Sequence, residues 1–332
     1  MRVLVVGGSA FIGAGIVSEL LGRGHAVAVA NRGVTKDPHG GRVERLVADR
    51  KEKGALARAI GGREFEAAID VSAFAGSDSE EAVAALRGRT GHLVHVSTGQ
   101  VYLVLKSCGK PAREDEYAGE TIPAPEAEED ETDWRYGLAK RACEDVLARA
   151  ASESGFRSTR VRIGIVHGPL DYQHRLTAYL ARFRDGGPVL LQDGGTRLAR
   201  HVDVRDVAAA VAAIAEKGPE VSGEALNLAW SETPTARDVV LELARISGSK
   251  APLVPVPRRS LHEAGLLPHA SPLGGPWASV VDPARARAAI AFAPRPWKET
   301  VAWVAEAFFR GETAPPPGLD RRADEIALAR RS

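Results

Sequence analysis

The chain has 332 residues, of which 44% are hydrophobic, and its formal net charge is +1. This length allows one large domain or two medium ones around an extended core, and the balanced charge excludes a basic field that would hold nucleic acid. No apolar run is long enough for a bilayer, and Cys108 and Cys143 lie outside any CxxC spacing. We therefore expect a cytoplasmic protein with no nucleic-acid or membrane partner and no disulfide framework.

Short apolar runs alternate with helical stretches through the first half of the chain. The predicted strands are residues 3–6, 25–30, 43–48, 67–71 and 92–97, and the predicted helices are residues 11–22, 78–86 and 136–151. This alternation predicts parallel strands whose crossover helices cover both faces of the sheet. We therefore predict an α/β fold with a doubly wound, Rossmann-type parallel sheet formed by residues 1–168.

An acidic segment, residues 114–133, lies between the last of these strands and the helix predicted at 136–151. It is rich in Asp and Glu and contains neither Lys nor Arg. Such a composition disfavours a core element, so we expect a surface loop. Two interpretations stay open, a solvated acidic insertion and a lid over the active site.

The second half of the chain has a looser pattern with Pro-rich connections. We predict a smaller substrate-binding lobe from residues 169–202 and 229–312, with residues 203–228 returning to the main sheet. Residues 313–332 form a tail that contains the pattern of a charged amphipathic helix over 318–331. That helix is either a docking arm, which would allow a homodimer, or a frayed tail.

A glycine-rich turn, residues 7–13 (GGSAFIG), directly follows the first strand and opens the first helix. In this context Gly7 permits the tight turn, Gly13 lets helix and strand approach, and the N–H groups at the helix start favour a pyrophosphate. The turn therefore predicts a dinucleotide site. Its predicted contacts are Gly7, Ser9, Ala10, Phe11, Ile12 and Gly13.

The second strand ends at Asn31 and Arg32, where an NAD-preferring site usually has a carboxylate for the adenine ribose. Asn31 can still form a hydrogen bond to the ribose. Arg32 offers a planar cation that suits a 2′-phosphate, unless it is an ordinary exposed arginine. We therefore predict NADP(H) as the cofactor, with NAD(H) as the alternative.

Three residues have the pattern of an acid–base centre for hydride chemistry. Tyr136 and Lys140 are four residues apart on a predicted helix, so they share a face and the ammonium can lower the pKa of the phenol. Thr98 follows the fifth strand at the carboxyl edge of the sheet, where doubly wound folds bind ligands. We predict that Tyr136 transfers the proton, Lys140 also holds the nicotinamide ribose, and Thr98 binds the substrate oxygen.

Together these features resemble the extended short-chain dehydrogenase/reductases, the group of the NAD-dependent epimerase/dehydratase type. The resemblance covers roughly residues 1–310 and rests on GGSAFIG (7–13), Asp49-Arg50, STGQVY (97–102), YGLAK (136–140), RIGIVHGP (162–169) and HVDVRDVA (201–208). It implies the same three catalytic roles and an adenine contact for Asp49. It also implies cofactor contacts for Arg50, Ser72 and Ala73.

The chain departs from the family pattern at the cofactor and at the catalytic threonine. Ala10 stands at the family's middle glycine, which adds a methyl group where the backbone nears the pyrophosphate. Gly99 and Gln100 replace the acidic pair that follows the threonine in sugar-nucleotide dehydratases. Elimination of water is therefore disfavoured, because its acid and base are missing.

Two further departures concern the substrate. Ile165 stands where many members have a substrate-binding Asn, and Ala199 where sugar-nucleotide enzymes often have an Arg. A diphosphate buried without a cation would be costly, so a smaller keto or hydroxy compound fits at least as well. The predicted substrate contacts are Gln100, His167, Arg197, Arg200 and His201. His167 and His201 have the alternative of being ordinary hydrogen-bonded histidines.

These observations predict an NAD(P)-dependent oxidoreductase that acts on a secondary alcohol or ketone. A ketoreductase is slightly favoured because Asn31 and Arg32 suggest NADP(H). The first alternative is an NAD-dependent epimerase of a sugar or sugar nucleotide through a transient ketone, and the second is a non-catalytic NADP-binding redox sensor. No metal site is predicted, because the nine histidines include no HxxxH or HExxH pair.

Overall fold

The computed structural model describes residues 1–36 and 38–332. The chain divides into two compact units that each combine several segments. Unit 1 contains residues 1–164, 204–229 and 281–293, and unit 2 contains residues 165–203, 230–280 and 294–332.

Unit 1 is built on a seven-stranded parallel sheet in the order β10-β6-β5-β4-β1-β2-β3. Its strands are β1 (Arg2–Val6), β2 (Ala26–Asn31), β3 (Glu44–Val47), β4 (Ala67–Asp70), β5 (Leu93–Thr98), β6 (Ser158–Ile163) and β10 (Ala225–Leu228). The strand order reverses beside β1, because the chain first runs outward through β2 and β3 and then returns to β4 on the other side of β1. In open sheets of this type ligands bind at the carboxyl ends of the strands at this reversal.

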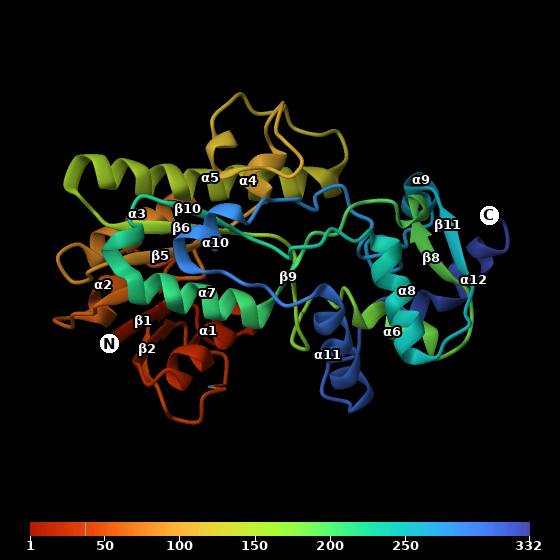
Figure 1. Ribbon diagram of the computed structural model, residues 1–332, viewed down its shortest axis with the longest axis horizontal. Coiled ribbons are helices and arrows are strands. Elements are labelled where there is room, and N and C mark those ends of the chain that lie inside the picture. The colour runs from red at the N-terminus through yellow and green to blue at the C-terminus, as the bar shows by residue number, and fades with distance from the viewer. Residues whose placement is uncertain (37) are drawn as a thin grey trace. The chain divides into compact units, whose positions relative to one another are not determined.

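Helices cover both faces of the sheet in unit 1. They are α1 (Phe11–Gly22), α2 (Ala55–Ile60), α3 (Gly76–Leu86), α4 (Gln100–Leu103), α5 (Glu128–Ser154), α7 (Val204–Lys217) and α10 (Ala284–Ile290). Helices α1 and α7 pack together on one face, and α3 and α5 pack together on the other (Figure 1). The predicted doubly wound α/β fold is therefore confirmed.

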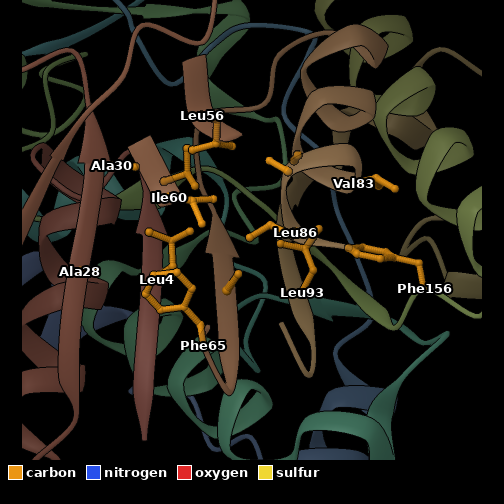
Figure 2. Close-up of a cluster of buried hydrophobic side chains, with 14 of the residues drawn as sticks. Leu4, Ala28, Ala30, Leu56, Ile60, Phe65, Val83, Leu86, Leu93 and Phe156 are labelled. Atoms are coloured by element: carbon orange, nitrogen blue, oxygen red, sulfur yellow. The ribbon is translucent and has the colours of Figure 1, made fainter. Parts of the chain in front are cut away.

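A core of buried aliphatic side chains joins the sheet to α2, α3 and α5. Leu4 and Leu93 come from the strands, Leu56 from α2 and Leu86 from α3, and each is at most 1% exposed (Figure 2). Such strands are apolar on both faces, which explains why they read as continuous apolar runs in the sequence. The predicted strands lie within one or two residues of the observed ones.

Unit 2 contains short strand pairs and five helices among the described residues. Strand β7 (Val166–His167) pairs with β9 (Val202–Asp203), and β8 (Val189–Gln192) pairs with β11 (Leu253–Val256), all in parallel. The helices are α6 (Thr177–Phe183), α8 (Ala236–Ser247), α9 (Arg258–Glu263), α11 (Trp297–Phe309) and α12 (Arg322–Ala329). A separate apolar core fills the space among α6, α8 and α11.

The acidic segment differs from its prediction at both ends. A 3₁₀ helix (Glu114–Tyr117) opens it, and the carboxylate of Glu114 is buried, where it accepts a hydrogen bond from the backbone N–H of Asn227 at 2.8 Å. Helix α5 has 27 residues and begins eight residues before the predicted start at Tyr136. The prediction of a surface loop was therefore wrong at these ends, because the carboxylate of Glu114 is buried with a backbone N–H donor and residues 128–133 belong to α5. Acidic residues also favour a helix start.

Two other segments lie elsewhere than expected. Residues 281–293 belong to unit 1, although we expected them in the substrate-binding lobe. The C-terminal helix α12 packs within unit 2, where Glu325 forms a buried ion pair with Arg182 of α6, so it is neither an arm reaching away from its own chain nor a frayed end. Among the described residues no helix is both long and apolar enough to cross a membrane.

Candidate active site

The glycine-rich turn closes tightly between β1 and α1. Gly7 has φ of 92°, a backbone conformation that side chains disfavour. A Cβ atom placed on Gly13 would lie 2.1 Å from the carbonyl oxygen of Gly7, so the helix contacts the turn backbone directly. A Cβ atom on Gly7 would lie 2.9 Å from the Cβ of Ser72. The positive φ of Gly7 and these two close approaches therefore require glycine at positions 7 and 13.

A cavity of about 430 Å³ opens at this turn, and we name it the turn cavity. Its lining includes eight predicted cofactor residues, Gly7, Ser9, Ala10, Asn31, Arg32, Asp49, Arg50 and Ser72. The other predicted cofactor residues, Phe11, Ile12, Gly13, Ala73 and Lys140, are not in its lining. It is also lined by residues that the sequence analysis missed, namely Val6, Ala30, Gly33, Val34, Thr35, Ala48, Lys51, Leu56 and Phe74.

Asn31, which lines the cavity as predicted, also has hydrogen-bond partners within the protein. Its Nδ2 donates to Ser9 Oγ at 2.6 Å, and its Oδ1 accepts from the backbone N–H of Gly33 at 2.8 Å. The amide thus joins the end of β2 to the glycine turn, so both of its polar atoms already have partners. The cations left at this part of the cavity are the exposed side chains of Arg32 and Lys51.

Lys140 lies buried between two strand ends. Its Nζ donates to the carbonyl oxygens of Ala73 at 2.8 Å and of Val96 at 2.7 Å, and the side chain is 2% exposed. Burial lowers the pKa of Lys140, because the charged form loses water. The ammonium also lies 5.7 Å from the ring centroid of Phe74, which lines the turn cavity.

Tyr136 and Thr98 approach Lys140 from a helix and from a strand. The ring of Tyr136 lies 6.3 Å from that of Phe74, centroid to centroid, one helical turn before Lys140 on α5. Thr98 ends β5, two residues after Val96, whose carbonyl oxygen binds Lys140. Its Oγ1 accepts the backbone N–H of Gln100. The three predicted catalytic residues therefore surround one strand end beside the cavity.

Helix α5 lies very close to α4 at the residue after the tyrosine. A Cβ atom on Gly137 would lie 2.6 Å from a methyl group of Val104 and 3.0 Å from the carbonyl oxygen of Gln100. The side chain of Gln100, a predicted substrate contact, donates to Asp133 Oδ1 at 3.0 Å. This amide therefore joins α4 to α5 and holds Tyr136 close to the end of β5.

A buried polar network supports the same helix one turn further along. Glu144, four residues after Lys140, accepts hydrogen bonds from Ser97 Oγ at 2.5 Å and from Arg162 Nη2 at 2.6 Å. Arg162 also donates to the hydroxyl of Tyr102 at 2.6 Å. Because Ser97 directly precedes Thr98, the network fixes the strand end against α5. The sequence analysis missed Glu144, although its i+4 spacing from Lys140 was visible.

Two of the four predicted substrate residues of unit 2, His167 and His201, lie in a buried aromatic cluster and not on an open surface. His167 Nε2 and His201 Nδ1 lie 2.7 Å apart, and both rings lie 5.6 Å from that of Trp230, centroid to centroid. Burial lowers the pKa of His201 to about 3 and that of His167 well below its ordinary value, so both rings are neutral. The structure thus brings together two of the four predicted residues of this unit.

The two predicted arginines of unit 2 are not part of the buried ring cluster itself. Arg200 donates to the carbonyl oxygens of Trp230 at 3.1 Å and of Ser231 at 3.2 Å, and Arg197 is exposed. Arg200 therefore anchors the backbone after β10. No group of three or more metal-binding side chains occurs among residues 1–36 and 38–332.

Comparison with known protein families gives a match over residues 3–229 to the NAD dependent epimerase/dehydratase family. This chain belongs to that family. Its family is one of NAD-dependent enzymes, in agreement with the predicted enzyme class and nicotinamide cofactor. The resemblance seen in the sequence is thereby confirmed, and the interpretation as a non-catalytic redox sensor is wrong.

One curated protein with a similar sequence is 2′-dehydrokanamycin reductase of Streptomyces kanamyceticus. The two are 31% identical over 218 residues, which is 64% of this chain and 57% of the relative. The match thus spans somewhat more than half of the relative's length.

Solved structures of epimerases and dehydratases share the fold. UDP-glucose 4-epimerase of Thermotoga maritima, solved with UDP-glucose, is 20% identical with a TM-score of 0.76 and covers 94% of this chain and 100% of its own. The Thermus thermophilus UDP-glucose 4-epimerase complex with NAD is 24% identical with a TM-score of 0.71, covering 93% and 99%. DesIV, a dTDP-glucose 4,6-dehydratase of Streptomyces venezuelae, is 19% identical with a TM-score of 0.73, covering 94% and 99%.

Proposed function

We propose that the protein is an NADP(H)-dependent ketoreductase that acts on a small keto compound such as a ketone on a sugar ring. One observation carries the proposal: two cations, Arg32 and Lys51, line the turn cavity beside an Asn31 whose amide is already engaged. A 2′-phosphate is favoured by two cations, whereas an NAD-type ribose needs an acceptor carboxylate at the end of β2. The named activity of the curated relative supports the direction of the reaction.

The residues of unit 1 fit a dinucleotide. The turn at Gly7 and Gly13 leaves no room for a Cβ atom, and it opens on a cavity beside the first turn of α1. Backbone N–H groups at such a helix start bind phosphate oxygens. The cavity ends at Phe74, close to Lys140 and Tyr136. A bound dinucleotide would therefore have its adenosine end near Arg32 and its nicotinamide end near Tyr136.

The chain's own residues then perform the proton transfer. The nicotinamide supplies the hydride when it is bound. Tyr136 donates the proton to the carbonyl oxygen of the substrate, while the hydroxyl of Thr98 orients that oxygen through a hydrogen bond. Lys140 is held by two backbone carbonyls, and its positive charge stabilises the phenolate that remains on Tyr136. The product alcohol leaves together with the oxidised cofactor.

An isotope experiment tests this proposal against an epimerase. The protein is incubated with a keto sugar and with NADPH that carries deuterium at the nicotinamide C4, and the product is analysed by mass spectrometry. A reductase transfers the label to the product in amounts that exceed the enzyme concentration. An epimerase would return an unlabelled epimer and retain tightly bound NAD⁺, which would contradict the proposal.

The cofactor preference has its own test in two matched variants. Removing both cations, as Arg32→Ala with Lys51→Ala, weakens NADPH binding by about 10- to 100-fold while NADH binding changes little. Arg58→Ala is the control, because Arg58 is a nearby exposed arginine outside the lining of the turn cavity. Fluorescence titration of the two reduced cofactors gives the dissociation constants. An unchanged NADPH affinity in the double variant would refute the preference.

A further inference from the structure

We propose that Arg50 is a positioning residue, which holds the loop after β4 so that the glycine turn and Lys140 keep their places at the cofactor. The inference rests on the nicotinamide cofactor of the proposed function but is independent of the substrate and of the choice between NADPH and NADH. It replaces the direct cofactor contact that the sequence resemblance implied for Arg50.

The guanidinium of Arg50 is enclosed by its own chain. Its two terminal nitrogens donate to Asp70 Oδ1 at 2.9 Å and Asp70 Oδ2 at 3.0 Å, and also to Ser72 Oγ and to the carbonyl oxygen of Asp78, both at 2.9 Å. Its Nε lies 3.4 Å from the carboxylate of Asp78, and the side chain is 14% exposed. All four terminal N–H groups therefore have an acceptor within the chain, and Nε–H, which has no hydrogen-bond partner among the described residues, is buried.

The residues that Arg50 holds define the loop at residues 71–75. Asp70 also accepts the backbone N–H of Ser72 at 3.0 Å. Asp78 accepts the backbone N–H of Phe74 at 2.7 Å and of Ala75 at 3.0 Å. Both ends of the loop thus bind carboxylates that Arg50 contacts, through charge-assisted hydrogen bonds at Asp70 and through the backbone carbonyl and an ion-pair contact at Asp78.

This loop connects Arg50 to both halves of the cofactor site. Ser72 contacts the glycine turn, because a Cβ atom on Gly7 would lie 2.9 Å from the Cβ of Ser72. The carbonyl oxygen of Ala73 accepts the hydrogen bond from Lys140 Nζ. A shift of the loop would therefore move the turn that faces the pyrophosphate and would remove one of the two acceptors that hold the lysine.

The test compares Arg50→Lys with Lys51→Met, the neighbouring cation that lines the same cavity. Lysine keeps the charge but has a single nitrogen, so it cannot span Asp70, Ser72 and Asp78 together. We expect Arg50→Lys to weaken NADPH and NADH binding by the same factor, about 10- to 100-fold. Lys51→Met should weaken NADPH alone. Fluorescence titration measures both, with circular dichroism as the check on folding.

Two further measurements separate positioning from a general loss of structure. In Arg50→Lys the limb of the kcat–pH profile that belongs to Tyr136 should move to higher pH, because Lys140 is held less firmly; a smaller folded fraction would not move it. Added guanidinium ion should partly restore cofactor binding to Arg50→Ala. If these variants fail to fold, Asp78→Asn tests the same loop and should weaken both cofactors equally.

Each outcome bears on one proposal. A loss of NADPH alone in Arg50→Lys would overturn the inference and make Arg50 a phosphate ligand. Unchanged affinities for both cofactors in Arg50→Lys would also overturn it. Absence of any cofactor binding to the unaltered protein would instead contradict the proposed function itself.

Discussion

Units 1 and 2 bury polar side chains in different ways. In unit 1, Lys140 has two carbonyl acceptors, and Arg50 and Arg162 lie against carboxylates. In unit 2, His167 Nδ1 and His201 Nε2 are buried and have no hydrogen-bond partner among the described residues. The indole nitrogen of Trp230 is likewise buried and has no hydrogen-bond partner among the described residues.

The difference concerns where the buried polar atoms without a partner lie. In unit 1 they come from several elements, for example Arg50 Nε, Ser79 Oγ and Arg160 Nε, whereas the three named in unit 2 belong to one cluster. A buried group without a partner costs free energy, so most native proteins avoid it unless a water molecule or a ligand supplies the bond. The polar groups of unit 1 hold backbone and helices in place before any ligand arrives. Unit 2 keeps unused hydrogen-bonding capacity in one aromatic cluster. Unpaired hydrogen-bonding capacity is therefore spread over several elements of unit 1 and concentrated at one place in unit 2.

The largest expected effect tests whether the chemistry resides in unit 1. Tyr136→Phe removes the proton donor but keeps the ring beside Phe74, so kcat should fall by about 10²- to 10⁴-fold. NADPH affinity should stay within about two-fold, since Tyr136 is outside the lining of the turn cavity. Steady-state turnover and cofactor titration measure the two effects. Retained turnover would remove Tyr136 from the mechanism.

A comparable effect on stability is expected in unit 2. Glu325→Gln leaves the guanidinium of Arg182, which is 0% exposed, without the charge that it faces, and should cost about 3–5 kcal/mol of the free energy of unfolding. Glu312→Gln is the matched control, because its pair with Arg310 is exposed and its loss should leave the unfolding midpoint nearly unchanged. Urea unfolding of both variants measures the two effects. Equal midpoints would show that the ion pair of α12 is dispensable for stability.

A smaller effect distinguishes two glycines of α1. Gly13→Ala drives a methyl group into the carbonyl oxygen of Gly7, which should cost about 1–3 kcal/mol and abolish cofactor retention. Gly15→Ala meets its first neighbour, a methyl group of Val204, at an ordinary 3.4 Å, so it should change stability by less than about 1 kcal/mol. Thermal melting with and without NADPH separates the two. Equal melting would contradict the close contact.

The effect that is smallest at neutral pH concerns acid. Because the pKa of His201 is about 3 in the folded protein, the unfolded chain binds the extra proton first as the pH falls below the ordinary histidine value. The contribution of neutral His201 to stability is thus present above about pH 6.5 and is lost towards pH 3, by up to about 1.4 kcal/mol per pH unit. His201→Leu should flatten the dependence of the unfolding free energy on pH over this range. An unchanged slope would mean that the folded protein does not hold His201 neutral over this range.

The residues that were located correctly from the sequence are those whose identity is required by the geometry of the backbone. Gly7 and Gly13 follow a strand and open a helix, and in this arrangement only glycine avoids a clash. Continuous apolar strands likewise predict a parallel sheet covered on both faces. Asn31 and Arg50 line the predicted cavity, but their partners within the protein were not predicted, because Ser9 lies in the turn after β1 and Asp70 ends β4.

The sequence alone therefore determined the fold class, the family and the position of the cofactor turn, since these depend on local periodicity and on steric limits within a few residues. Only the tertiary structure decided which polar groups were already paired. Glu114 is buried rather than solvated, α12 packs within unit 2, and His167 meets His201 and Trp230, because each of these pairings joins residues far apart in the chain. A hydrogen bond depends on distances of a few tenths of an ångström between such residues, which no local pattern encodes.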